Sequence, residues 1–234
     1  FQYSGPLLHL FCTLLSSLRV AFKMEHENTL RRAKTAVENL IASAECEWKE
    51  YKKGGKGRII VYQRHNDDSK LSIYMGVAEM ALSPSRVLQL VSDSEKRREW
   101  DPSVVFEDTR TVKSWKTPDM GEILIYRDAH SSMLGGIISG RDMSNIRNVS
   151  VDEAKYESVF VSVVDASLIP EEKKYVRAWC NPSGMIGKID ESTGKLKMYY
   201  VLETDPRGKI PSWATGKAIA QSIIDLLAFL IKHE

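Results

Sequence analysis

The chain has 234 residues, with 33 basic and 31 acidic side chains and a formal net charge of +2. This length predicts one compact domain with a full-sized core. The near balance of charges lacks the concentrated positive field that a phosphate backbone attracts, so nucleic acid is not an expected partner. Three isolated cysteines, Cys12, Cys46 and Cys180, predict neither a disulfide framework nor a zinc site and favour a reducing cytoplasm.

The N-terminal stretch from Leu7 to Phe22 is apolar, but it is too short and too often interrupted by polar residues to predict a membrane span. The chain opens with Phe1, and a plausible start occurs at Met24. We therefore expect residues 1–23 to lie outside the domain, as a tag or vector-derived sequence, an upstream region or a signal remnant. The domain itself is expected to occupy residues 24–234.

Apolar residues recur at intervals of three and four between Asn28 and Glu45, which predicts an amphipathic helix. Ser83 and Pro84 favour the start of a short helix, because serine caps helices well and proline is tolerated in the first turn. A second short helix is expected at residues 95–99. Between the first and second of these helices, the predicted elements are three antiparallel strands at residues 48–51, 58–62 and 71–77.

Strand-like segments then follow one another with no long helix between them, which predicts hairpin connections. These segments are residues 104–112, 122–128, 143–149, 156–165, 175–189 and 195–204. After Pro211 the pattern switches to a strongly apolar helix. The nine strands with a helix at each end predict an α+β fold in which a curved antiparallel sheet wraps the last helix. Because that helix is apolar around much of its circumference, a second layer or a bound ligand must cover the side that the sheet leaves open.

Five short motifs occur in an order and spacing that resemble the START (StAR-related lipid transfer) domain family, from about Thr29 to the C-terminus. They are Ser83–Val87, Glu95–Asp101, Arg141–Asp142, Tyr175–Ala178 and Asp205–Pro211. One departure is Gly140, because the family usually has proline before the Arg-Asp pair, and a looser loop is expected there. The resemblance is closest to the branch that includes StAR itself and that binds sterols or carotenoids.

The resemblance implies a helix-grip fold, in which a nine-stranded sheet wraps the C-terminal helix around an internal hydrophobic cavity. It also implies non-enzymatic binding and intermembrane transfer of a single lipid, a sterol or a carotenoid. A phospholipid transfer protein of the phosphatidylcholine type and a lipid-sensing domain of a larger protein are the alternatives. The loop 130–140 and the C-terminal helix would gate the cavity, with Gly135, Gly136, Gly140 and Gly216 as candidate hinges.

In the sterol-binding branch, an acidic residue at the end of one strand pairs inside the cavity with an arginine of the next strand. Asp128 and Arg147 occupy the matching positions here. A buried ion pair adds little to stability, so we expect this pair to orient a ligand hydroxyl, directly or through water. An ordinary structural ion pair is the alternative. The rest of the cavity wall and lid is expected to comprise Tyr126, Met133, Leu134, Ile137, Met143, Asn145, Trp179, Ile219, Ile223, Leu226, Leu227 and Leu230.

No catalytic or metal-binding constellation is recognisable in the sequence. The five histidines are scattered, and Ser139 does not sit in a Gly-x-Ser-x-Gly elbow. We therefore expect no enzymatic activity, cofactor or metal, and a monomer that is cytoplasmic and peripheral to membranes. A transient contact with an anionic bilayer would use basic residues near the last helix, although solvated surface side chains would look the same. These residues are Lys195, Lys197, Arg207, Lys209 and Lys217.

Overall fold

The computed structural model describes residues 6–43, 47–132, 138–163, 166–210 and 212–234, except for the side chains of residues 6–15, 212 and 213. The helices are α1 (Pro6–Ala42), α2 (Pro84–Ser92), α3 (Ser94–Trp100) and α4 (Ser212–Lys232), with a 3-10 turn at Gly55–Gly57. The strands are β1 (Lys49–Gly54), β2 (Ile59–His65), β3 (Ser72–Met80), β4 (Arg110–Thr117), β5 (Gly121–His130), β6 (Gly140–Val151), β7 (Lys155–Ser162), β8 (Tyr175–Arg177), β9 (Trp179–Cys180), β10 (Ser183–Ile189), β11 (Leu196–Leu202) and β12 (Thr204–Asp205).

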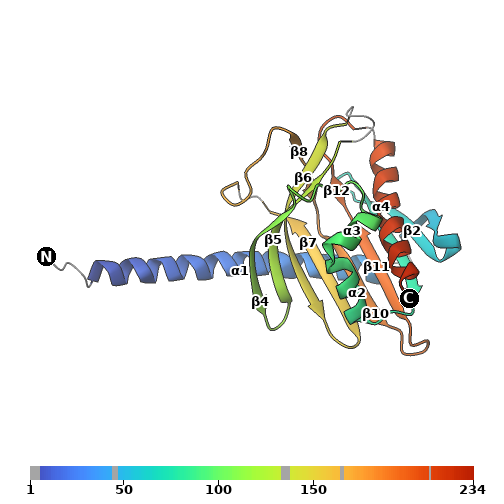
Figure 1. The fold of residues 1–234 in the computed structure, drawn as a ribbon, viewed down its shortest axis with the longest axis horizontal. Coiled ribbons are helices and arrows are strands. Elements are labelled where there is room, and N and C mark those ends of the chain that lie inside the picture. Colours follow the sequence, from blue (N-terminus) through green and yellow to red (C-terminus); the bar gives the residue numbers. More distant parts are fainter. Residues whose placement is uncertain (1–5, 44–46, 133–137, 164–165, 211) are drawn as a thin grey trace.

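Nine antiparallel strands form the main sheet, in the order β1-β2-β3-β11-β10-β7-β6-β5-β4 (Figure 1). The short strand β8 adds to β6 in parallel, and β9 pairs with β12 in a separate two-stranded sheet. The large antiparallel sheet and the C-terminal helix confirm the predicted α+β helix-grip fold.

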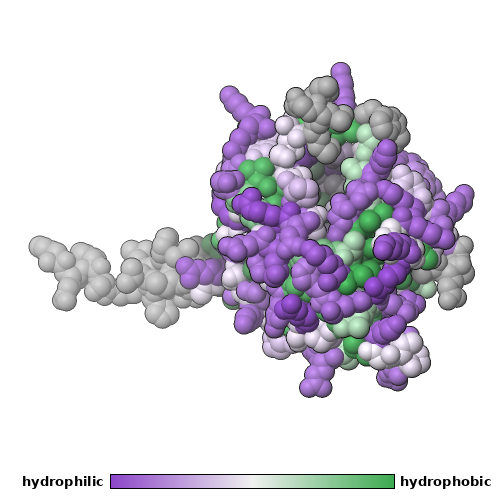
Figure 2. Space-filling view, turned by 45° about the vertical axis from the view of Figure 1, so that its right-hand side comes forward, coloured by the Kyte–Doolittle hydropathy of each residue, from purple (hydrophilic) through white to green (hydrophobic). Residues whose placement is uncertain are grey.

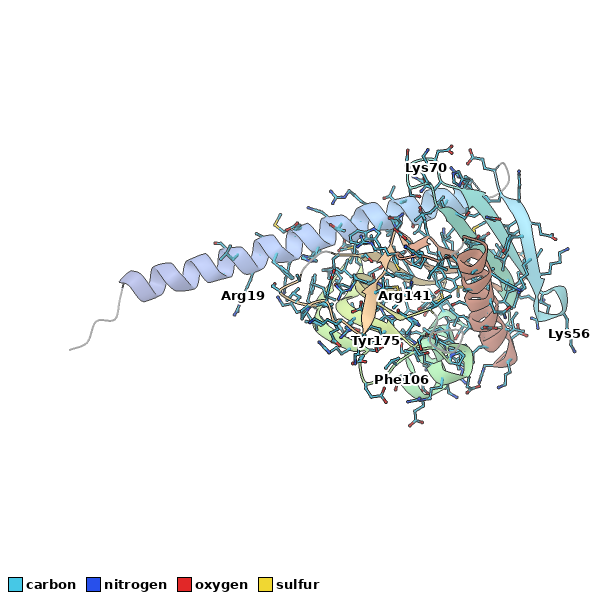
Figure 3. All side chains as sticks on the ribbon, turned by 90° about the horizontal axis from the view of Figure 1, so that it is seen from above. Arg19, Lys56, Lys70, Phe106, Arg141 and Tyr175 are labelled. Atoms are coloured by element: carbon cyan, nitrogen blue, oxygen red, sulfur yellow. The ribbon has the colours of Figure 1, made fainter. Side chains whose placement is uncertain are left out.

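Helices α1 and α4 lie on opposite faces of the sheet, as the view from above shows (Figure 3). On one face, Leu30, Ala33 and Val37 of α1 pack against β-strand residues such as Ile123 and Ile146. On the other face, α4 packs against β1, β2 and β3. The sheet therefore separates two cores, and a cavity of about 670 Å³ lies on the α4 side.

Helix α1 runs without a break through residue 23, where the edge of the domain is expected. After Pro6 the sequence has no proline or glycine before Gly54, so nothing local ends the helix near Met24. Residues 16–21 are exposed, and Arg19 lies on the part of α1 that projects beyond the sheet (Figure 3). The helix thus begins earlier than the periodicity predicts and ends earlier, at Ala42.

The predicted strand at residues 104–112 is mostly wrong, because β4 begins at Arg110. The preceding residues form turns, with the Asp108 and Thr109 amides donating to the Val105 carbonyl at 3.1 and 3.0 Å. The predicted strand at residues 175–189 is broken into β8, β9 and β10. Pro182 lies between β9 and β10 and lacks the N–H group that a continuous ladder needs there.

Both predicted short helices form, and each begins after a capping side chain. The Ser83 hydroxyl accepts the Arg86 amide at 3.2 Å, with Pro84 in the first turn of α2. The Asp93 carboxylate accepts the Glu95 and Lys96 amides at 3.0 and 3.2 Å, which caps α3 and places it directly after α2.

Helix α4 is long and apolar enough to cross a membrane by length and composition. In this fold it is a core helix, since Ala220, Ile223, Leu227 and Leu230 are fully buried. Glycine at position 76 of β3 permits this close packing: a Cβ there would lie 2.2 Å from the Cγ2 atom of Ile223.

Candidate functional site

A cavity of about 670 Å³ lies between the sheet and α4. Along β5 the side chains alternate, so that Ile123, Ile125 and Arg127 are buried on the α1 face, whereas Tyr126 and Asp128 line the cavity. Strands β6 and β7 contribute alternate residues in the same way. Among the lining side chains are Arg141, Met143, Asn145 and Arg147 of β6, Tyr156, Ser158 and Phe160 of β7, and Ala218, Ile219 and Leu226 of α4.

Much of the cavity wall is apolar or aromatic. Its larger members are Trp100, Met143, Phe160, Met185, Tyr200, Leu202, Ile219 and Leu226. Burial raises the pKa of Tyr126 and of Tyr156 to about 12, so both phenols stay neutral near pH 7. The outer face in Figure 2 is mostly hydrophilic, with smaller apolar areas between charged residues. The interior of the cavity therefore suits a mainly hydrocarbon ligand.

Asp128 of β5 pairs with Arg97 of α3 at the cavity wall. The Arg97 Nη2 atom lies 2.9 Å from each carboxylate oxygen, and it also lies 2.9 Å from Asp101 Oδ2. Burial disfavours the charge on Asp128, but the neighbouring charges of Arg97 and His130 outweigh it and hold the pKa of this carboxyl below its usual range. Asp128 therefore stays ionised and is already bound to a cation.

His130 joins the same network from the end of β5. Its Nδ1 atom lies 2.9 Å from the Ser103 hydroxyl, and its Nε2 atom lies 3.7 Å from Asp128 Oδ2. Burial lowers the pKa of His130, but Asp128 and Asp101 more than offset this and raise the pKa above its usual value. The Ser103 hydroxyl donates to Asp101 at 2.8 Å, so its proton is directed to a carboxylate rather than to the imidazole. Ser103, His130, Asp101 and Asp128 thus form one network of charges and hydrogen bonds at the cavity wall.

Arg147 has a different environment, although it lines the same cavity. Its guanidinium lies over the Tyr126 ring, 4.9 Å from the ring centroid. Its Nε atom is buried and has no hydrogen-bond partner among the described residues. Arg147 is thus a cavity cation whose contact is with an aromatic face.

The expected ion pair between Asp128 and Arg147 is not formed. In the β5–β6 register Asp128 is opposite Met143, and Arg147 is opposite Leu124. The two backbone positions are therefore offset by about 13 Å along the strands, from four residues at about 3.3 Å each. The sequence places both on the cavity face, which is correct, but the register and Arg97 prevent their pairing.

The other expected cavity residues fall into four groups. Tyr126, Met143, Asn145, Ile219 and Leu226 line the cavity. Ile223, Leu227 and Leu230 do not, because they lie on the face of α4 that packs into the core. Trp179 lines a separate cavity of about 390 Å³ instead. Met133, Leu134 and Ile137, together with the hinge candidates Gly135 and Gly136, lie outside the described residues.

The two hinge glycines that the structure describes are both sites of close packing. A Cβ at Gly140 would lie 2.7 Å from the His130 carbonyl oxygen, and a Cβ at Gly216 would lie 2.2 Å from the Tyr74 hydroxyl. Gly140 is therefore the first residue of a tightly paired strand, which differs from the looser loop expected there.

The Arg141-Asp142 motif ties two parts of the fold to β6. Arg141 donates from Nε to the Pro206 carbonyl at 3.1 Å and from Nη2 to the Arg207 carbonyl at 3.0 Å, which fixes the segment before α4. Asp142 lies on the opposite face of the strand, where it accepts from Arg127 at 2.9 Å and from Arg177 of β8 at 2.9 and 3.0 Å. The contacts of this motif thus hold the segment before α4 and the strand β8 to β6.

The residues of the cavity offer little for covalent chemistry. Burial raises the pKa of the Cys180 thiol to about 11, which leaves it a poor nucleophile at neutral pH. In the part of the chain that the structure describes, no cluster of three or more potential ligands could hold a metal ion.

A profile of the START domain family matches residues 29–232. The chain belongs to the START domain family. This START domain also has close structural neighbours among solved proteins. Human StAR-related lipid transfer protein 5 superposes with a TM-score of 0.70 at 19% identity, covering 88% of this chain and 96% of its own. Human STARD10 gives 0.61 at 18%, covering 81% and 78%, and a STAR-related lipid transfer protein of Xanthomonas axonopodis gives 0.59 at 20%, covering 80% and 98%.

These identities show a common fold, and family membership supports lipid binding and transfer in general terms. The START domain has features that such a role needs: a cavity of about 670 Å³ with a mainly apolar wall and polar groups at defined positions.

Proposed function

We propose that this START domain binds one lipid molecule in the cavity and carries it between membranes, with a sterol or a carotenoid as the first candidate. The observation that carries this proposal is the apolar cavity of about 670 Å³ between the sheet and α4. Its size falls within the range of about 300–1,000 Å³ that is usual for sites that enclose a small organic ligand.

Burial of hydrocarbon would drive uptake. A sterol-sized molecule hides several hundred Å² of apolar surface, which at about 25 cal/mol per Å² corresponds to about 10 kcal/mol before the costs of association. A phosphatidylcholine has about twice as many non-hydrogen atoms as a sterol and would fit a cavity of this size less readily. Phospholipid transfer is therefore the second candidate. A lipid-sensing domain of a larger protein would use the same cavity.

Ligand exchange would require the wall to open. The cavity is bordered at one end by Ser131, Ile138 and Ser139 of the loop 130–140, and by Ala214 and Thr215 in the first turns of α4. We propose that these two segments separate at a membrane surface, as expected of a cytoplasmic, peripheral protein that acts as a monomer. The basic residues Arg207, Lys209 and Lys217 near this end would favour an anionic bilayer.

The test is to identify lipids that co-purify with the protein by mass spectrometry, and then to measure transfer of cholesterol, a carotenoid and phosphatidylcholine between vesicles. A matched pair of variants connects transfer to the cavity. Ala218→Trp puts bulk on a position of α4 that lines the cavity, whereas Ser85→Trp makes a similar change on an exposed position of α2 that does not line it. We expect Ala218→Trp to lose most transfer and Ser85→Trp to keep it. Absence of bound lipid together with absence of transfer of all three classes would contradict the proposal.

A further inference from the structure

The acidic groups of the cavity wall leave Arg147 without a counter-charge. The described carboxylates that line the cavity are Asp101, Asp128 and Asp225. Arg97 binds the first two, and Asp225 accepts the Gln221 side-chain amide at 2.7 Å. Within the described residues, neither a salt bridge nor a hydrogen bond joins any of them to Arg147.

Hydrogen-bond donors without acceptors also gather around this cavity. Among the described residues, five buried side-chain polar atoms lack a partner, and two of these, Arg147 Nε and Trp100 Nε1, belong to residues that line the cavity. Both can only donate. A buried N–H group without an acceptor is costly, and the ring of Tyr126, which faces the Arg147 guanidinium, offsets only part of that cost.

The position of Arg147 indicates how a ligand would lie. The lining residues of β6 run from Arg141, which is fixed to the segment before α4, to Arg147 six residues further along the strand. This separation is about 20 Å at about 3.3 Å per residue. An elongated lipid could therefore place its polar end at Arg147 and its hydrocarbon body between that point and the end of the cavity beside α4.

We infer that this cavity selects lipids with an anionic head group, a carboxylate or a sulfate ester, and that Arg147 is the residue that reads it. The inference rests on the proposed lipid-binding function and changes its expected ligand from a neutral sterol or carotenoid to a lipid with an anionic head. Arg147 is the specificity-determining cation because Arg97 neutralises Asp128. A planar guanidinium matches the two oxygens of a carboxylate or sulfate, and such charge-assisted pairs are stronger than a bond to a neutral hydroxyl. A sterol alcohol has one hydroxyl, whose own proton would need an acceptor that Arg147 does not supply.

The experiment compares two pairs of probes that differ in charge at the head. Oleate and oleyl alcohol test whether the anionic lipid is a fatty acid, and cholesterol sulfate and cholesterol test whether it is an acidic sterol. Binding of each probe is measured by its displacement of one fluorescent lipid from the full-length protein. We expect at least one anion to bind about tenfold or more tightly than its neutral partner. The pair with the larger difference then identifies the source of the anionic group.

Variants show whether Arg147 causes the preference. Arg147→Gln should bring the ratio of anion to neutral affinity close to one, and Arg147→Lys, which keeps the charge but loses the planar fork, should retain part of it. Arg86→Gln removes the same charge from the exposed surface of α2 and should leave the ratio unchanged.

Equal or tighter binding of both neutral probes by the unmodified protein would overturn the inference while leaving lipid binding intact. So would a preference for the anion that persists in Arg147→Gln. Failure of all four probes to bind, with no co-purifying lipid, would instead contradict the proposed function on which the inference rests. The comparison within the unmodified protein needs no variant, so it stands even where a substitution impairs folding.

Discussion

Arg97 of α3 donates to both carboxylate oxygens of Asp128 on β5, at 2.9 Å each. This contact fastens a short helix to the sheet at the cavity wall, and it decides which charge in the cavity is left for a ligand. The side chains of Arg97 and Asp128 are 19% and 13% exposed, so solvent screens the pair only weakly.

Replacing Arg97 with glutamine should therefore leave a buried carboxylate without its cation. We expect Arg97→Gln to lower the free energy of unfolding at pH 7 by about 3 kcal/mol, measured by urea denaturation. The control is Arg98→Gln, which removes from the same helix an exposed guanidinium that lies 4.1 Å from the Phe106 ring centroid, and should cost less than about 1 kcal/mol. Equal losses in the two variants would show that Asp128 does not depend on Arg97.

The same pair predicts a pH dependence on the acid side. Because the pKa of Asp128 is lower in the folded protein than in the unfolded chain, its contribution is present above the unfolded value of about 4 and is lost as the pH falls further. Urea denaturation between pH 3 and 6 should show this loss in the unmodified protein, and Arg97→Gln should show less of it. A difference between the two proteins that does not change with pH would contradict this assignment.

His130 predicts a dependence of the opposite sign. Its pKa is raised in the folded protein, so its stabilising charge is present below the unfolded value of about 6.5 and is lost as the pH rises through the folded value. The free energy of unfolding of the unmodified protein should therefore decrease above about pH 6.5 relative to that of His130→Asn. Parallel profiles for the two proteins from pH 5.5 to 8.5 would mean that His130 does not titrate against Asp128 and Asp101.

A buried glutamate fastens α1 to the sheet. Glu157 of β7 is 2% exposed and binds Lys34 of α1 at 2.9 Å, and it also accepts from Asn148 at 2.8 Å. Glu157→Gln should destabilise the fold by about 1–3 kcal/mol and increase hydrogen exchange in α1. Glu38→Gln serves as the control, because Glu38 is 40% exposed and its contact with Lys155 is 3.5 Å long. Unchanged exchange in α1 would show that apolar packing alone holds this helix.

Gly76 of β3 sets the distance between the sheet and α4. Gly76→Ala would force its Cβ against Ile223 and Leu227, at 2.2 and 2.9 Å, and should cost about 1–3 kcal/mol through displacement of the helix. Because the neighbouring residues Ile219 and Leu226 line the cavity, lipid binding should weaken as well. The double variant Gly76→Ala with Ile223→Ala removes the nearest methyl and should recover part of the lipid affinity. If binding stays at the level of the unmodified protein in Gly76→Ala, the cavity does not depend on this spacing.

Much of the fold follows from patterns that are local in the sequence. Ser83 with Pro84 marks the start of α2, and the period of two along β5 places Tyr126 and Asp128 on one face. These signals work because a helix cap and a strand face each depend on residues a few positions apart.

What the sequence leaves out are relationships between distant elements. The offset of Asp128 from Arg147 depends on the β5–β6 register, which the number of intervening residues does not fix. The Arg97–Asp128 contact joins a helix to a strand 31 residues away. Arg97 belongs to the Glu95–Asp101 motif, so the family resemblance marks the residue. Its contact with Asp128 could be recognised only from the way α3 packs against the sheet. Trp179 faces the second cavity because side chains alternate along β9, and its neighbour Cys180 lines the main one.

Mutations of neighbouring residues of β6 can reduce lipid transfer for different reasons, only one of which is contact with the lipid. Arg141 borders the cavity and Asp142 does not, yet both support it by fixing the segment before α4 and β8 to one strand. A scan that scores variants by lipid transfer alone would rank the two together with Arg147. Thermal melting of each variant separates them, since variants of Arg141 or Asp142 should lose transfer and melting temperature together.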